Sequence, residues 1–91
     1  MPPIVVIIVK LMPESPESDL EAIRKAARST LEPEGAKNIS FEERPIAFGL
    51  KALIVKMDMP EEKGTDLVEN KLATIKGISS VTIEDYRRAF G

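Results

Sequence analysis

Apolar residues open the chain as one nearly unbroken run over residues 3–12, and β-branched side chains occupy both faces of that run. This pattern is typical of a central strand that is covered on one side by helices and at least partly covered on the other. Pro13 and Pro16 then interrupt the run. We therefore expect the first strand to lie in the middle of a sheet.

The spacing next becomes helical, with apolar residues three or four positions apart at Leu20, Ile23, Ala27 and Leu31. Ser18-Asp19-Leu20-Glu21 has the form of a capping box, with the Ser18 hydroxyl at the N-cap and the Glu21 carboxylate three residues on. Pro33 and Gly35 are typical of a helix end. The pattern predicts a helix that begins at 18 or 19.

Two strands are predicted after this helix. Residues 39–42 alternate between apolar and polar, residues 44–49 read as a connection, and residues 50–59 form a second strand run. Within that run, one face is predicted to carry Leu53, Val55, Met57 and Met59. The alternation indicates that the first of these two strands is half exposed and the second is more deeply buried.

A second helix and a last strand complete the pattern. Thr65 or Asp66 is expected to cap the helix, and Gly77 is expected to be its left-handed C-terminal cap. The apolar positions of this helix are Leu67, Val68, Leu72 and Ile75. The last strand is predicted over residues 80–86, with Val81 and Ile83 facing inward.

The predicted order is strand, helix, strand, strand, helix, strand. The ferredoxin-like plait satisfies it with right-handed crossovers: an α+β fold with a four-stranded antiparallel sheet and two helices on one face. The first and third strands are central in this fold, in agreement with their apolar character. The other face stays open, so apolar side chains of residues 4–9, and Ala52 or Ile54, that fall on it would be available to a partner.

Composition narrows the function classes. The 91 residues predict a single domain over residues 1–91. Thirteen basic and fifteen acidic residues give a net charge of -2, so no overall field attracts nucleic acid. The absence of Cys and His removes disulfides, imidazole chemistry and nearly every zinc or copper site. The apolar run is too short to span a bilayer and has no signal-peptide flanks, so we expect a cytoplasmic protein without membrane contact.

Known chemistries of the plait find little support. An RNA-recognition module needs aromatic residues on the two central strands, and neither predicted strand carries one. The loop over residues 11–18 has no Gly or Arg for an anion and no cysteine pair for a metal. The acidic residues near the two helix starts complement helix dipoles: Glu14, Glu17, Asp19, Glu21, Glu61 and Glu62. We therefore predict no catalytic residue, no metal site and no cofactor.

Two features suggest a partner. Phe48 lies in a turn rich in Pro and Gly, although only 4 % of the chain is aromatic. A ring folded back over the end of the sheet is the alternative. Arg87 and Arg88 follow the last strand of an otherwise acidic chain, where a frayed, solvated end is the alternative. The strand directions could bring turn and tail together, which the sequence leaves open.

Residues 45–53 (Pro-Ile-Ala-Phe-Gly-Leu-Lys-Ala-Leu) and 78–88 (Ile-Ser-Ser-Val-Thr-Ile-Glu-Asp-Tyr-Arg-Arg) closely resemble the guanine-nucleotide exchange domain of translation elongation factor 1-beta. The resemblance covers essentially the whole chain, and the length matches the short archaeal form. It implies a plait that binds the GTPase elongation factor 1-alpha and speeds release of its GDP, without covalent chemistry. The tail departs from the family's usual Gln, Asp and Lys, which are replaced by Ser79, Thr82 and Arg88.

The resemblance also implies the roles of individual residues. Phe48 would enter the GTPase beside its nucleotide domain, and a basic tail residue would reach the Mg²⁺ and phosphate region. The expected partner-binding residues are Pro45, Ile46, Phe48, Gly49, Lys51, Arg87 and Arg88. Two alternatives remain from the sequence: a non-catalytic interaction or small-ligand regulatory module, and, less favoured, an RNA-binding plait.

Overall fold

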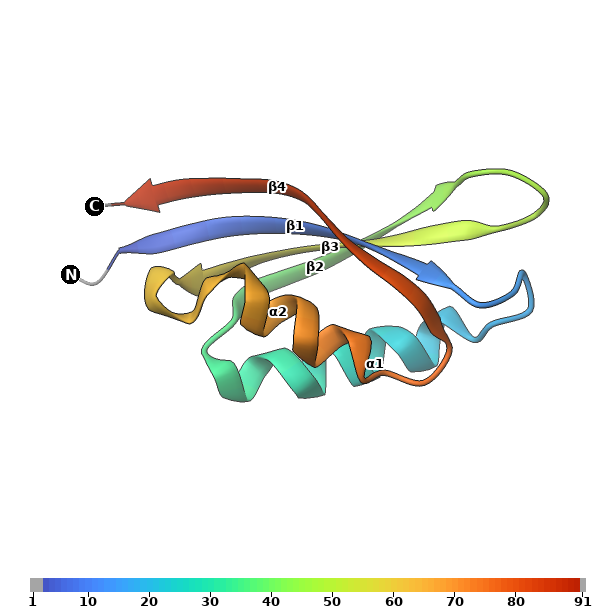
Figure 1. Cartoon of the computed structure of the whole chain (residues 1–91), viewed down its shortest axis with the longest axis horizontal. Coiled ribbons are helices and arrows are strands. Elements are labelled where there is room, and N and C mark those ends of the chain that lie inside the picture. Colours follow the sequence, from blue (N-terminus) through green and yellow to red (C-terminus); the bar gives the residue numbers. More distant parts are fainter. Residues whose placement is uncertain (1–2, 91) are drawn as a thin grey trace.

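The computed structural model of the protein describes residues 3–90. The strands are β1 (Ile4–Pro13), β2 (Lys37–Pro45), β3 (Lys51–Pro60) and β4 (Ile78–Phe90). The helices are α1 (Leu20–Leu31) and α2 (Gly64–Ala73), with short 3-10 helices η1 (Glu32–Glu34) and η2 (Glu61–Lys63). The sheet has the order β2-β3-β1-β4 with antiparallel neighbours, and both helices lie on the same side of it (Figure 1). The predicted ferredoxin-like plait is confirmed.

The two central strands build the core from alternate residues. Val5, Ile7, Val9 and Leu11 of β1 are completely buried. They pair in register with four completely buried residues of β3, namely Met59, Met57, Val55 and Leu53. The helices complete the core with Ile23, Ala27, Leu31, Val68 and Leu72, and Ile75 adds to it just after α2. Burial of these side chains against one face of the sheet supplies the main driving force for folding.

The opposite sheet face is less available than the sequence suggests. Ala52 is completely buried and Ile54 is 6 % exposed, so the expectation that a partner could reach these two side chains is wrong. On this face, Arg44 of the edge strand β2 donates to both carboxylate oxygens of Glu84 in the other edge strand, at 3.1 and 3.0 Å. The ion pair therefore passes over the two central strands and covers apolar surface with the arginine stem.

Helix α1 begins one residue later than the capping box implies. Asp19, not Ser18, is the N-cap: its carboxylate accepts hydrogen bonds from the backbone N–H groups of Glu21 and Ala22, at 3.1 and 3.2 Å. The Ser18 hydroxyl instead accepts from the N–H of Ser15 and closes the preceding turn. Two adjacent residues can each cap a helix, and the local turn engages the first of them.

Helix α2 begins two or three residues earlier than predicted. The 3-10 helix over residues 61–63 continues directly into it, so Lys63 stands at the N-cap without a side-chain hydrogen bond, and the predicted caps at Thr65 and Asp66 are wrong. Gly77 has the expected left-handed conformation (φ +95°), but the helix ends earlier, with Thr74 as its C-cap. Both differences follow from short 3-10 and turn segments at the helix ends, which apolar spacing does not reveal.

The edge strands are longer than predicted. Strand β2 extends over residues 37–45, and β4 extends over residues 78–90, well beyond the predicted end at 86. Strand β4 pairs with β1 along this length, with register shifts at three places. One shift lies between Ile8 and Val9, which pair with Asp85 and Ile83, so that Glu84 is an extra residue in β4. The tail arginines therefore belong to a paired strand.

We predict that Asp19→Ala lowers the free energy of unfolding by about 1 kcal/mol, because it leaves two N–H groups at the start of α1 without their acceptor. Urea denaturation measures the change. The matched control is Ser18→Ala, which leaves the helix cap in place. A larger loss of stability in Ser18→Ala than in Asp19→Ala would contradict the assignment of the N-cap.

Candidate functional site

The connection between β2 and β3 is a tight hairpin turn. The N–H of Ile46 donates to the carbonyl of Leu50, and the N–H of Leu50 donates to the carbonyl of Ala47, each at 2.9 Å. The two residues inside this last bond, Phe48 and Gly49, have φ values of +54° and +78°. Positive φ at both central positions is the signature of a type I′ turn, which suits the twist of the flanking strands.

Phe48 is an unusual residue for this position. A left-handed conformation costs a residue with a side chain about 1–2 kcal/mol, and Gly or Asn adopts it more readily. The side chain recovers nothing by packing, because it is 95 % exposed, and neighbouring Ile46 is 47 % exposed. The alternative in which the ring folds back over the sheet is wrong. The hairpin presents two apolar side chains to solvent at its tip.

The base of the hairpin is braced against the rest of the domain. A Cβ atom placed on Gly49 would lie 3.7 Å from Cβ of Pro16, so the turn approaches the loop that follows β1. Lys51 lies 3.8 Å from Glu43, whose second carboxylate oxygen accepts from the Arg24 guanidinium of α1 at 2.6 Å. These contacts restrict the hairpin below the tip and leave the ring free.

The two arginines of the predicted site lie on opposite faces of β4. Arg87 pairs in register with Val6, whose side chain is on the open face, and its Nε is 2.8 Å from Asp85 Oδ2. Arg88 pairs with the buried Val5 and so lies on the helix side. Consecutive residues of a strand point to opposite faces, so the two cations occupy different surroundings.

Arg88 makes a two-point ion pair with Glu61 of η2. Its Nε and Nη2 each donate to one carboxylate oxygen, both at 2.5 Å. These hydrogen bonds, with the positive charge of Arg88, hold the pKa of the Glu61 carboxyl below its ordinary value, against a smaller opposing effect of desolvation. Sequence reasoning treated Glu61 as one of several helix-start carboxylates, and the pairing across 27 residues gave no local signal.

The hairpin tip and the arginines occupy opposite ends of the molecule. Figure 1 shows the β2–β3 turn at one end of the long axis and the end of β4 at the other, and the longest dimension is 44 Å. The sequence left open whether turn and tail share an edge, and in this fold they do not. Of the predicted residues, Pro45, Ile46, Phe48, Gly49 and Lys51 form one cluster, and Arg87 and Arg88 form the other.

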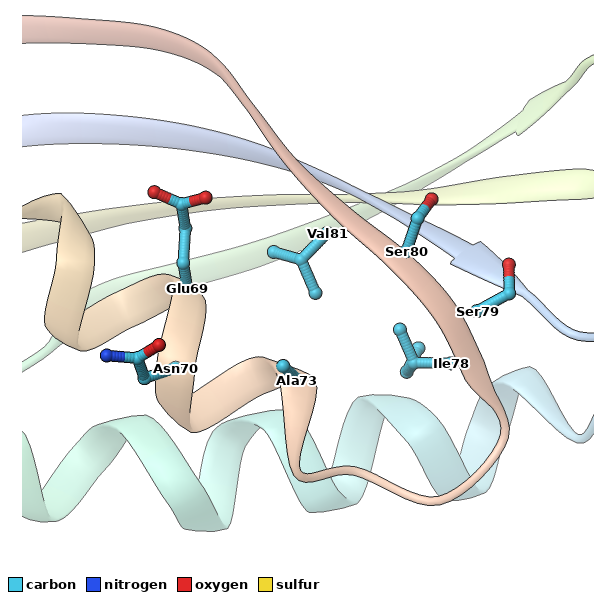
Figure 2. A pocket seen from close by; sticks show the side chains of 7 residues that line it. All are labelled: Glu69, Asn70, Ala73, Ile78, Ser79, Ser80 and Val81. Atoms are coloured by element: carbon cyan, nitrogen blue, oxygen red, sulfur yellow. The ribbon is translucent and has the colours of Figure 1, made fainter.

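A hollow of about 340 Å³ lies between α2 and the start of β4 (Figure 2). Figure 2 shows the polar groups of Glu69 and Asn70 well separated from the hydroxyls of Ser79 and Ser80. The Ser79 hydroxyl already donates to the carbonyls of Met12 and Pro13, at 3.2 and 3.4 Å. These side chains do not converge on one ligand-sized point, as a built small-molecule site requires.

No group of three or more Asp or Glu side chains within residues 3–90 is placed to hold a metal ion. None of the helices in this range is both long and apolar enough to cross a membrane. The notable surface features of the described chain therefore remain the apolar hairpin tip and the charged end of β4.

One known protein family matches nearly the whole chain. The model of the EF-1 guanine nucleotide exchange domain matches residues 6–89. The chain belongs to this family. The match spans β1 to β4 and so includes both the hairpin and the tail arginines. The function of the chain is accordingly that of a guanine-nucleotide exchange factor in translation elongation.

Archaeal members of the family are similar over nearly their full length. Elongation factor 1-beta of Methanothermobacter thermautotrophicus is 44 % identical over 85 residues, which cover 92 % of this chain and 94 % of that protein. The protein of the same name from Desulfurococcus amylolyticus is 42 % identical over 86 residues, with the same coverage of 92 % and 94 %. That of Haloarcula marismortui is 41 % identical, with coverage of 88 % and 91 %.

We predict that Phe48→Asn raises the free energy of unfolding by about 1 kcal/mol, because Asn adopts the left-handed conformation at lower cost and Asn-Gly is the preferred type I′ pair. Little apolar burial is lost, since the ring is 95 % exposed. Urea denaturation measures the gain. A variant less stable than the natural chain would show that the ring packs in solution.

We further predict that the Glu61 carboxyl titrates below its ordinary value of 4.5 in the folded chain, because Arg88 favours the charged form. The lowered pKa makes the contribution of this pair to stability fully present above pH 4.5 and lost as the pH falls through the folded-state pKa. A carbon-detected NMR titration of the carboxyl measures the midpoint. Arg88→Ala should move that midpoint back toward 4.5, and an unchanged midpoint would contradict the pairing.

Proposed function

We propose that the chain binds the GTPase elongation factor 1-alpha in the cytoplasm and speeds release of its GDP, with the hairpin tip as an apolar wedge and the β4 arginines as cations near the phosphate region. It makes or breaks no covalent bond in this role. The observation that carries the proposal is Phe48, which is 95 % exposed in a left-handed turn position. Neither packing nor backbone preference explains a phenylalanine there, whereas a partner's apolar pocket does.

Exchange of this kind follows from linkage. A GTPase holds GDP with the backbone amides of its phosphate loop and with Mg²⁺. A protein that binds the loosened, metal-free form more tightly than the GDP-bound form must weaken GDP binding by the same coupling free energy. The exchange factor therefore needs surface complementarity and charge, and it needs no acid, base or nucleophile.

The two clusters imply a contact at two separated places. They lie toward opposite ends of a 44 Å molecule, so a partner that meets both must extend along the sheet. Ile46 and Phe48 would supply apolar surface, and Arg87 and Arg88 would supply positive charge. Pro45, Gly49 and Lys51 shape and brace the hairpin, which reduces the ordering cost of binding.

The alternatives predict different observations. A small-ligand regulatory module needs converging polar groups, and the hollow beside α2 does not provide them. An RNA-binding plait would bind RNA with strong salt dependence, because phosphate contacts release counterions. We expect no direct contact with nucleic acid or membrane, so a salt-dependent shift with RNA would favour that alternative over the exchange function.

We predict that Phe48→Ala lowers the stimulated release of labelled GDP from elongation factor 1-alpha by about tenfold or more, as loss of a buried aromatic anchor does at other interfaces. Release is followed by fluorescence after mixing the loaded GTPase with sub-saturating amounts of the variant and excess unlabelled GDP. The circular dichroism of the variant should be unchanged, because the ring makes almost no contact within the domain.

Three comparison variants sharpen this experiment. Phe48→Leu should retain part of the activity because it keeps an apolar side chain, while Phe48→Asn should lose activity although its turn is favoured. Lys25→Ala changes an exposed residue of α1 and should stimulate GDP release from the GTPase as strongly as the natural chain does. Unchanged release with Phe48→Ala would remove the wedge, and a natural chain that fails to stimulate release would overturn the proposed function.

A further inference from the structure

We infer that Glu61 is a latch on Arg88: in the free chain its carboxylate occupies the guanidinium that, during exchange, meets the anionic phosphate region of the GTPase. The inference rests on the proposed function and adds a residue to it. Glu61 does not touch the GTPase in this scheme. It sets how readily Arg88 becomes available.

The ion pair joins two elements whose backbones are held in place, η2 and β4. Both carboxylate oxygens of Glu61 accept from different nitrogens of Arg88, at 2.5 Å each. The backbone N–H of Glu61 donates to the carbonyl of Pro3 at 3.1 Å, which ties η2 to the start of β1. Arg88 of β4 pairs in register with Val5 of β1. The backbone thus brings the two side chains together before they interact.

The latch limits what Arg88 can offer. A guanidinium has five N–H donors, and the two nitrogens that present them toward Glu61 are engaged. The carboxylate also cancels the positive charge at short range, so an incoming phosphate or carboxylate meets a weaker field. An anion of the partner must therefore displace Glu61 or share Arg88 with it.

The latch is nevertheless easy to open. The side chains of Arg88 and Glu61 are 56 % and 29 % exposed, so water and ions reach the pair. Exposed pairs contribute little to stability, and a multivalent anion such as a nucleotide phosphate competes well for arginine. Rotation of the Arg88 side chain is enough to break the pair, and β4 can stay paired with β1 throughout.

Arg87 provides an internal contrast. Its partner, Asp85, lies two residues away on the same strand, and the Arg87 side chain is 78 % exposed. That pair connects nothing beyond β4. Only the neighbouring arginine is tied to a second element, and this distinguishes the two cations that the sequence could not tell apart.

Glu61→Gln tests the inference. It keeps the shape of the side chain and removes the charge, so stimulated GDP release at sub-saturating exchange factor should rise by about two- to fivefold, the range expected for loss of an exposed ion pair. The matched control is Glu62→Gln, which changes the net charge equally. Glu62 is exposed and makes no ion pair within residues 3–90. That control should release GDP like the natural chain.

A double variant separates the latch from a general charge effect. The double variant Arg88→Ala with Glu61→Gln should stimulate GDP release at the same rate as the single variant Arg88→Ala. A Glu61→Gln rate equal to that of Glu62→Gln, or below it, overturns the latch and leaves the exchange function standing. A rise that persists without Arg88 also overturns it. Failure of the natural chain to stimulate release overturns both, and all other comparisons are made relative to that chain.

Discussion

The pairing of β1 with β3 on one side and with β4 on the other is the constraint on which the structure depends. It buries alternate residues of β1 completely and gives both helices one apolar face to cover. Because all neighbours are antiparallel, it also decides where the connections and the chain end fall. The β2–β3 hairpin emerges beyond one end of the sheet, and the paired end of β4 lies at the other. The separation of the two clusters of predicted partner-binding residues is thus a property of the topology.

The hairpin and the tail illustrate different ways to present a binding group. Phe48 is exposed by backbone geometry, since a turn with two left-handed residues leaves its side chain without neighbours. Arg88 is exposed but engaged, because a carboxylate from a distant element meets it. In the proposed role, the first arrangement would be ready for a partner at a cost in stability, whereas the second would exchange an internal anion for an external one.

The fold was predictable because burial imposes a period on the sequence. The unbroken apolar run of β1 indicates a central strand, and the two-residue period of β3 and the helical spacing of Ile23, Ala27 and Leu31 each indicate one buried face. The Pro/Gly turn indicated an outward Phe48 but left open a ring folded back over the sheet, and only its exposure in the structure decides between the two. The helix starts were less predictable, because Ser18 and Asp19 are equally suited to capping and only the local turn separates them.

The charged contacts were not predictable, because they depend on register. Glu61 meets Arg88, and Arg44 meets Glu84, across 27 and 40 residues of chain. Apolar periodicity says which face of a strand is buried, but it does not say which residues stand opposite each other once bulges are present. The length of β4 was hidden for a related reason, since Arg87 and Arg88 interrupt its apolar pattern and join the sheet by pairing with β1.

The extra residue at Glu84 has a consequence for which arginine carries the internal contact. If Glu84 instead paired with Ile8, the pairing seen at Val9 and Ile83 would continue unshifted, and Val5 would stand opposite Arg87 in place of Arg88. Arg87 would then lie on the helix side near Glu61, and Arg88 would lie on the open face of the sheet. This single bulge therefore decides which of the two chemically identical arginines faces the helices and which faces the open side of the sheet.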